Sequence, residues 1–234
     1  MLFRSNAFYR YLEQLNEVAR LEIVGMYVEE EARIIHVFGR TPGIPHRYYY
    51  RRLVNTTQNS WLTGQWTAWE KVELDIEGEH LIPVIWNRRL YLFWAIFTEK
   101  AVQPGRTSES DNGTPPQKYW EIQLAYSEYR NGQWSAKTVS DLNIRGDNLN
   151  QENYIFKAFN NDELVIRCYV TEGELPIQAI ATNEFVVSNC SGQIQVRDVY
   201  EMYLSYLRPL GNSFKMNSLV EDRSEEHTSE LQSP

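Results

Sequence analysis

The chain repeats one pattern of residues. Gly-Gln-Trp at residues 64–66 recurs at residues 132–134, and the tryptophans Trp66 and Trp134 are 68 positions apart (134 − 66). In both copies an Asn-rich turn and an apolar segment follow, and this segment runs into Thr-Glu at residues 98–99 and 171–172. Self-similarity of this kind indicates one supersecondary unit that is built more than once.

Each copy has the pattern of a four-stranded antiparallel β-meander. Residues 119–126 alternate between apolar and polar side chains, which is typical of a half-buried strand. Asn131-Gly132 predicts a tight hairpin, because both residues tolerate positive φ. We therefore expect a mainly β fold of antiparallel four-stranded meanders resembling β-propeller blades. The expected strands are residues 47–54, 65–74, 81–86 and 90–97 in the first copy and 119–126, 133–139, 154–159 and 164–170 in the second, and a third, partial unit begins near residue 185.

The segment 90–97 is apolar on both faces. Leu90, Leu92 and Trp94 would point one way, and Tyr91 and Phe93 the other. A strand with two apolar faces is expected to pack between two neighbouring sheets.

The beginning of the chain has a helical pattern instead. Apolar residues recur at helical spacing from Phe8 to Leu21, and Asn6 is a suitable N-cap. We expect one amphipathic helix over residues 7–24 and a strand over residues 33–38. A helix without a partner must dock on the sheets or belong to a helical region upstream.

The other end is expected to be artificial. Residues 223–233 resemble the in-frame translation of a sequencing-adapter oligonucleotide, and residues 223–234 are therefore left out of the fold prediction. On this interpretation the natural protein continues past about Asp222, and both ends are cut from something larger.

Composition excludes several classes of protein. The formal net charge of −8 argues against a nucleic-acid-binding surface, which needs a basic face. The longest apolar run, residues 90–97, is too short to span a bilayer, and the first residues do not form a signal peptide. Cys168 and Cys190 are too few for a disulfide scaffold. Cys168 is expected to be a buried thiol, although pairing with Cys190 stays open.

Motifs for catalysis and for metal or cofactor binding are missing from the sequence. It has no His-Glu-x-x-His, Gly-x-Ser-x-Gly, phosphate-binding loop or Cys-x-x-Cys. His36, His46 and His80 are isolated, so structural roles are expected for them rather than metal binding. No cofactor or metal is expected.

One dense acidic stretch is a candidate contact surface. With strand periodicity, Glu73, Asp75, Glu77 and Glu79 share one face beside His80. They could form an ordinary solvated strand whose charges discourage edge pairing. The alternative is a pH-sensitive electrostatic contact, which loosens on acidification if the carboxylates face arginines of a neighbouring subunit.

Several segments of the sequence resemble a known protein family. Residues 8–19 (FYRYLEQLNEVA), 36–41 and 46–52 resemble the A component of bacterial insecticidal toxin complexes. Residues 66–72 and 80–94 resemble the neuraminidase-like domain of the same family. The resemblance is dense from about Phe8 to Tyr126 and looser to about Asp222.

This resemblance implies a secreted, extracellular, pentameric subunit whose helical shell and β domains enclose a channel. The implied partners are other copies of the subunit, the B and C components, and a host receptor or glycan. Membrane contact would occur only through the channel of the full-length protein, which carries a toxic enzyme across. Residues 1–32 would end the helical shell region, and residues 33–222 would form the neuraminidase-like domain, with repeat units at about 46–100, 118–173 and 185–222.

Three functions follow from these observations. The leading one is a structural and assembly module of the toxin shell. The second is a glycan- or receptor-binding module that stacks Trp61, Trp69 and Tyr129 on sugars. The third is a sialidase, which needs an arginine triad, a Tyr–Glu nucleophile pair and Asp-box turns. Residues 127–134 come nearest to an Asp-box but lack its Asp, and we expect the domain to be non-catalytic.

Overall fold

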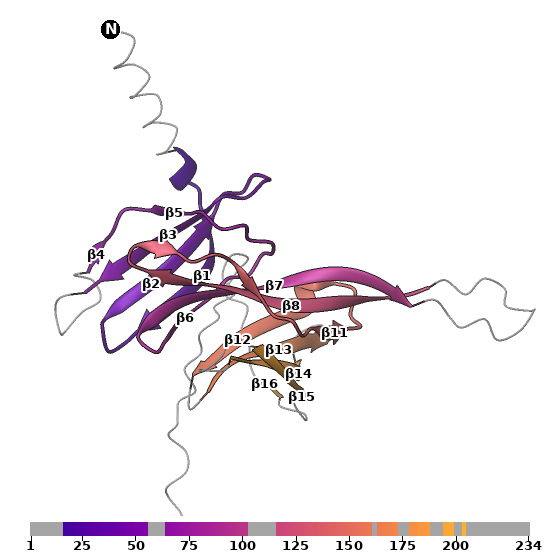
Figure 1. Ribbon diagram of the computed structural model, residues 1–234. Coiled ribbons are helices and arrows are strands. Elements are labelled where there is room, and N and C mark those ends of the chain that lie inside the picture. The colour runs from indigo at the N-terminus through magenta and orange to yellow at the C-terminus, as the bar shows by residue number, and fades with distance from the viewer. Residues whose placement is uncertain are drawn as a thin grey trace, which may run out of the picture.

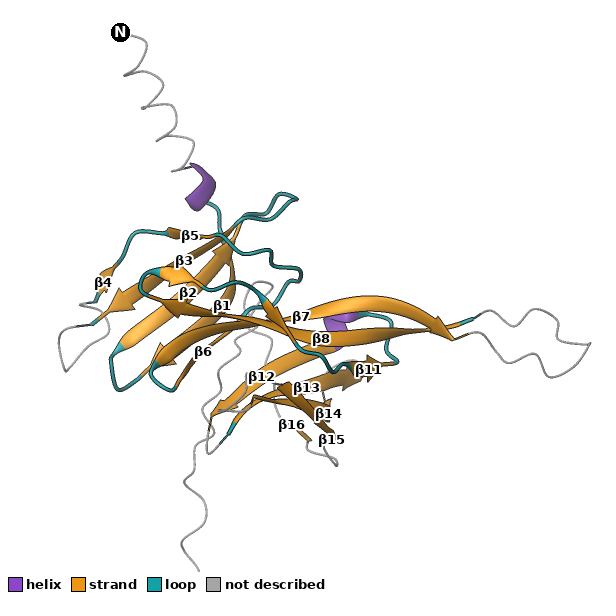
Figure 2. Cartoon of the chain, in the orientation of Figure 1, coloured by secondary structure: helices purple, strands orange, loops and turns teal. Residues whose placement is uncertain are grey.

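Three antiparallel β-sheets make up the described part of the chain (Figure 1). The computed structural model describes residues 16–55, 64–102, 116–160, 163–172, 178–187, 194–198 and 203–204. Figure 2 shows strands joined by loops, with very little helix. Helix is limited, within the described ranges, to residues 16–18 and the 3-10 helix η2 (Gln151–Asn153). The prediction of a mainly β fold with antiparallel meanders is confirmed, whereas closure into a propeller stays a prediction.

All three sheets share one design, a three-stranded meander followed by a broken fourth strand. In sheet A, β1 (Glu22–Glu29), β2 (Ile34–Arg40) and β3 (Tyr48–Val54) are followed by β4 (Gln65–Trp66) and β5 (Glu70–Val72), which both pair with β3. In sheet B, β6 (Ile82–Trp86), β7 (Arg89–Val102) and β8 (Gln117–Arg130) are followed by β9 (Gln133–Trp134), β10 (Thr138–Val139) and β11 (Ile144–Gly146), all on β8. In sheet C, β12 (Tyr154–Asn160), β13 (Leu164–Glu172) and β14 (Gln178–Val187) are followed by β15 (Ile194–Asp198) and β16 (Tyr203–Leu204), both on β14.

The boundaries of the expected repeat units are shifted by about half a unit from the boundaries of the sheets. The strands expected within residues 46–100 are divided between sheets A and B, and those within residues 118–173 between sheets B and C. The hydrogen-bonded units instead span residues 22–72, 82–146 and 154–204. A sequence period fixes the spacing of a unit, but it does not show which strands pair, so it leaves the starting point undefined.

The two Gly-Gln-Trp copies do occupy equivalent backbone positions. Trp66 lies opposite Leu53 of β3, and Trp134 lies opposite Tyr129 of β8, so each begins a broken fourth strand. The hairpin turn before Trp134 is confirmed, because Asn131 and Gly132 have φ angles of 53° and 79°.

The helix predicted over residues 7–24 is not confirmed. Residues 22–24 belong instead to β1, which pairs with β2 along its length and has a bulge between Ile23 and Gly25. Residues 7–15 of the prediction lie outside the described residues. Sheet A therefore begins at Glu22, upstream of the expected boundary at residue 33. Pairing with β2 outweighs the helical spacing of the apolar residues, because local periodicity is weaker than tertiary pairing.

The long strands predicted over residues 65–74 and 133–139 are each split in two. Between the pieces, Thr67 N donates to Arg52 O at 2.9 Å, and Ser135 N donates to Glu128 O at 2.8 Å. Strand β11 lies between the expected strands 133–139 and 154–159, where no strand was predicted.

Strand β7 lies in the middle of the core, as its two apolar faces predict. Leu90, Leu92 and Trp94 pack with residues of sheet A. Tyr91 and Phe93 point the other way and pack with residues of sheet C. Sheet B is thus buried on both faces by sheets A and C.

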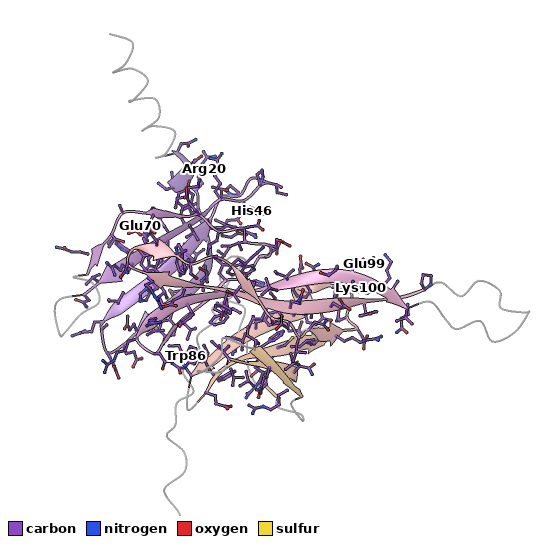
Figure 3. The ribbon with its side chains drawn as sticks, viewed as in Figure 1. Arg20, His46, Glu70, Trp86, Glu99 and Lys100 are labelled. Atoms are coloured by element: carbon purple, nitrogen blue, oxygen red, sulfur yellow. The ribbon has the colours of Figure 1, made fainter. Side chains whose placement is uncertain are left out.

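Two further features position the sheets. Leu81, just before β6, donates its N–H to Val24 O of β1 at 3.0 Å, which joins the edges of sheets A and B. The far ends of β7 and β8 project from the body as a hairpin that carries Glu99 and Lys100 (Figure 3). There Lys118 Nζ lies 2.8 Å from Glu99 Oε1.

Candidate functional site

A cleft of about 300 Å³ between sheets A and B gathers more chargeable groups than the sequence indicated. The residues lining it come from β1, β2 and β3 on one side and from the β6–β7 and β8–β9 hairpins on the other. They are Glu29, Ile34, His36, Tyr50, Arg52, Ile85, Arg88, Arg89, Leu90, Glu128, Tyr129, Arg130 and Asn131.

His36 is the buried centre of this cleft. On the inner face of β2 its ring is parallel to that of Tyr50, with centroids 6.0 Å apart. Its Nδ1 lies 2.8 Å from Tyr50 Oη, and its Nε2 lies 3.2 Å from Glu29 Oε2. Burial lowers the pKa of His36 below its ordinary value, against the opposing influence of the Glu29 carboxylate. The imidazole is therefore neutral at pH 7.

A neutral imidazole fixes the direction of both hydrogen bonds. A carboxylate can only accept, so His36 donates from Nε2 to Glu29. Nδ1 then accepts the hydroxyl proton of Tyr50. Burial raises the pKa of Tyr50, so its hydroxyl stays protonated at physiological pH. Tyr50, His36 and Glu29 thus form a chain of two hydrogen bonds, and the donor and acceptor of each bond are assigned.

Four arginines line the cleft, and they differ in their partners. Glu128 is shared, because Arg89 Nη1 lies 3.0 Å and Arg130 Nε 3.3 Å from its Oε1. Arg52 and Arg88 have no carboxylate partner among the residues that the structure describes. Arg88 lies in the β6–β7 turn with φ 61°. Arg52, Arg88 and Arg130 meet only through the packing of two sheets, so no local sequence signal could have found this group.

The acidic stretch keeps its predicted alternation but is not a strand. Regular structure ends at Val72, and Glu73, Asp75 and Glu77 are exposed, while the intervening apolar side chains are half-buried. Lys137 of sheet B reaches across, with its Nζ 2.7 Å from Asp75 Oδ2 and 3.4 Å from Glu77 Oε1. The hydrogen bond to Asp75 is the main cause of a raised Lys137 pKa. Two of the candidate carboxylates thus already bind a cation of the same chain.

Glu79 and His80 lie at a different place. They border a cavity of about 250 Å³ together with Gly78, aromatic residues of sheets B and C, and the η2 segment. Tyr154 in its wall donates its hydroxyl to Asn148 O at 2.9 Å, and burial raises the pKa of Tyr154 to about 12. Of the five proposed contact residues, Glu79 and His80 thus line this cavity, whereas Asp75 and Glu77 bind Lys137.

Two of the three residues expected to stack on sugars lie in the described part of the chain. Trp61 lies outside the described residues. Trp69 packs on the guanidinium of Arg51, with its ring centroid 4.3 Å from Cζ. Tyr129 is half-buried against Trp134, and its hydroxyl donates to Glu70 Oε2 at 2.9 Å.

Within the described ranges, no group of three His, Cys, Asp or Glu side chains could hold a metal ion. In the same part of the chain, no helix has the length and apolar character needed to cross a membrane. Cys168 is buried as expected, whereas Cys190 lies outside the described residues.

A family model described as the neuraminidase-like domain matches residues 21–182. The chain is 21% identical to TcdA4 of Morganella morganii, with a TM-score of 0.48 over 76% of this chain and 8% of that one. It is 19% identical to TcaA-TcaB of Yersinia pseudotuberculosis, with a TM-score of 0.42 over 67% of this chain and 8% of that one. The chain thus spans 8% of the length of these solved structures. No curated protein matches it.

Proposed function

The chain belongs to the neuraminidase-like domain family, and we propose that it serves as a structural and assembly module of a toxin-complex A subunit. The sequence resemblance to A components, dense from Phe8 to Tyr126, supports this function. In the full-length protein this module would belong to the shell of a secreted pentamer and would contact its other copies and the B and C components.

The observation that carries the proposal is that the Tyr and Glu side chains of the cleft are not arranged as a nucleophile pair. Burial raises the pKa of Tyr50, which is the opposite of what a nucleophilic phenolate requires. Glu128 is held by two arginines, and Glu29 accepts from His36. These bonds tie strands together within sheet A and within sheet B, and we infer that the domain is non-catalytic.

The test uses two substitutions in the full-length subunit. Tyr50→Phe removes the hydroxyl without creating a cavity, whereas Trp134→Ala removes packing between sheets A and B. A structural module should assemble with Tyr50→Phe and assemble poorly with Trp134→Ala, as measured by the yield of pentamer in size-exclusion chromatography. Hydrolysis of a fluorogenic sialoside by the wild-type protein, lost in Tyr50→Phe, would refute the non-catalytic assignment.

Receptor or glycan binding is the second candidate, and the cleft arginines favour it. Arg52 and Arg88 offer two guanidinium groups to an anionic sugar, in a cleft open to solvent. A glycan array on the 234-residue chain should then show anionic ligands whose binding is lost in the Arg52→Gln, Arg88→Gln double variant.

The acidic stretch supplies a third, regulatory element of the proposal. Loss of the negative charge on Asp75 and Glu77 would release Lys137 and weaken a link between sheets A and B. Replacing Glu73, Asp75 and Glu77 by their amides in the full-length subunit should ease channel release at neutral pH and flatten its acid response. An unchanged release profile would return these residues to an ordinary solvated loop.

A further inference from the structure

Arg51 stands out on the face of sheet A that points away from sheet B. Residues alternate along β3, so Tyr50 and Arg52 face the cleft while Arg51 faces outward. Its Cζ lies 4.0 Å from the ring centroid of Trp66 and 4.3 Å from that of Trp69. Two indoles therefore pack on one guanidinium.

Separate parts of sheet A hold the two rings in place. Trp66 is fixed by β4, where it pairs with Leu53. Trp69 lies against Gly39 of β2, where an added Cβ would come within 3.4 Å of its Cη2. The cation is thus held by rings that β4, β5 and β2 position in advance.

Arg51 has a hydrogen-bond donor without a partner among the described residues. An aromatic face attracts a guanidinium but accepts none of its hydrogen bonds in the guanidinium plane. Nε of Arg51 is buried and has no hydrogen-bond partner, and no carboxylate pairs with Arg51 among the described residues. Burial lowers the pKa of Arg51, although an arginine keeps its charge at any physiological pH.

The same face already binds one carboxylate of the chain. Glu17 forms an ion pair with Arg47, and Tyr49 donates its hydroxyl to Glu17 Oε2 at 2.5 Å. Tyr49 and Arg51 are successive outward-facing residues of β3. The guanidinium of Arg51 therefore lies on the same face as the side chains that bind Glu17. The guanidinium fork of Arg51 matches the two oxygens of a further carboxylate.

The surroundings fit a protein better than a sugar. Strand register places Val37 opposite Arg51 and Met26 opposite Val37 on this face, with Val28 and Ile35 in the next row. Met26, Val28 and Ile35 are only half-buried, and Trp66 is 47% exposed. Apolar side chains around a Trp–Arg centre are typical of the energetic centre of a protein interface.

We propose that Arg51, Trp66 and Trp69 form a docking site for a partner protein that inserts a carboxylate side chain flanked by apolar residues. The carboxylate accepts two hydrogen bonds from the edge of the guanidinium, and its apolar neighbours cover Trp66 and the half-buried residues of β1 and β2. This site is separate from the cleft, and it holds whether or not the chain is a shell module.

The experiment selects decapeptides from a random displayed library on the 234-residue chain. Enriched peptides should contain an Asp or Glu next to Leu, Ile or Phe. Replacing that acid by its amide, or replacing Arg51 by Gln, should each weaken binding at least about tenfold, and the two changes together should weaken it no further. Arg51→Lys, which keeps the charge and loses the fork, should recover only part of the affinity.

Arg145→Gln is the matched control. Arg145 also packs on an aromatic ring, with its Cζ 4.3 Å from the centroid of Tyr119, but it is already paired with Asp147 at 2.9 Å. Binding should be unchanged in this variant. In protein labelled with 5-fluorotryptophan, the ¹⁹F resonances of Trp66 and Trp69 should shift when peptide is added.

Three results would overturn the proposal. The first is enrichment of peptides without an acid, and the second is equal binding to wild type and Arg51→Gln, with both proteins shown to be folded by circular dichroism. The third comes from a parallel titration with a sulfated oligosaccharide. If only the sulfated sugar binds in an Arg51-dependent way, the site recognises oxyanions of glycans and not a protein partner.

Discussion

Trp66 and Trp134 hold equivalent backbone positions in two sheets, yet their replacement should have unequal effects. Trp134 is half-buried between sheets A and B, with its ring centroid 4.9 Å from Tyr129, 5.8 Å from Phe38 and 6.1 Å from Tyr50. Truncating a well-packed aromatic costs about 3 kcal/mol in lost burial and in the cavity left behind. We therefore expect Trp134→Ala to lower the free energy of unfolding by about 3 kcal/mol.

Trp66 has a weaker environment. It is 47% exposed, and its ring packs on the guanidinium of Arg51. Solvent can fill the space that Trp66→Ala leaves, and an exposed cation–π contact contributes about 0.5–1 kcal/mol. The expected loss is about 1 kcal/mol. Equivalent backbone positions therefore do not give equal packing, because the same register places one indole between two sheets and the other at an outer surface.

Thermal unfolding followed by circular dichroism measures the difference. In a domain of this size, 1 kcal/mol corresponds to a shift of roughly 2–4 °C in Tm. Trp134→Ala should lower Tm by roughly 6–12 °C and Trp66→Ala by roughly 2–4 °C. Tyr119→Ala, an aromatic truncation outside this interface, serves as a control for general destabilisation. Equal shifts for the two tryptophan variants would refute the account given for the contact between sheets A and B.

Three further outcomes are expected from single changes. The folded-state pKa of His36 is lowered, so the unfolded chain binds a proton at His36 before the folded chain does as pH falls below about 6.5. The free energy of unfolding of the wild type should therefore decrease in this range. Urea titrations of His36→Phe should show a smaller decrease. The folded-state pKa of Lys137 is raised, so its ion pair with Asp75 stabilises the fold below a pH of about 10.4 and is lost as pH rises through the folded-state pKa. The difference in unfolding midpoint between wild type and Lys137→Met should therefore shrink in alkaline buffer and stay constant near neutrality. At Gly25 an added Cβ would lie 2.8 Å from Leu81 O, so Gly25→Ala should cost about 1–3 kcal/mol, and a Tm equal to that of the wild type would show that the junction of sheets A and B is not tight.

The candidate site was only partly predictable. The alternation of Glu73, Asp75 and Glu77 with buried neighbours follows from the sequence, because burial with a period of two does not require a regular strand. Their partner Lys137 does not, since the contact joins segments 62 positions apart (137 − 75). The His36–Tyr50 contact likewise depends on tertiary structure. Adjacent strands bring the two rings together, and pairing between strands is not encoded in the spacing of either residue alone.

The sequence alone determined the class of this protein. Apolar alternation and turn residues such as Asn131-Gly132 act locally, so they fixed the strands, the hairpin and the double-faced burial of β7. Only the tertiary structure decided the grouping of strands into sheets, the start of sheet A at Glu22, and the different surroundings of Trp66 and Trp134. These features depend on which hydrogen-bonding edges meet and on which faces are covered. A sequence repeat determines neither the paired edges nor the covered faces, because every unit has the same local pattern whatever its neighbours are.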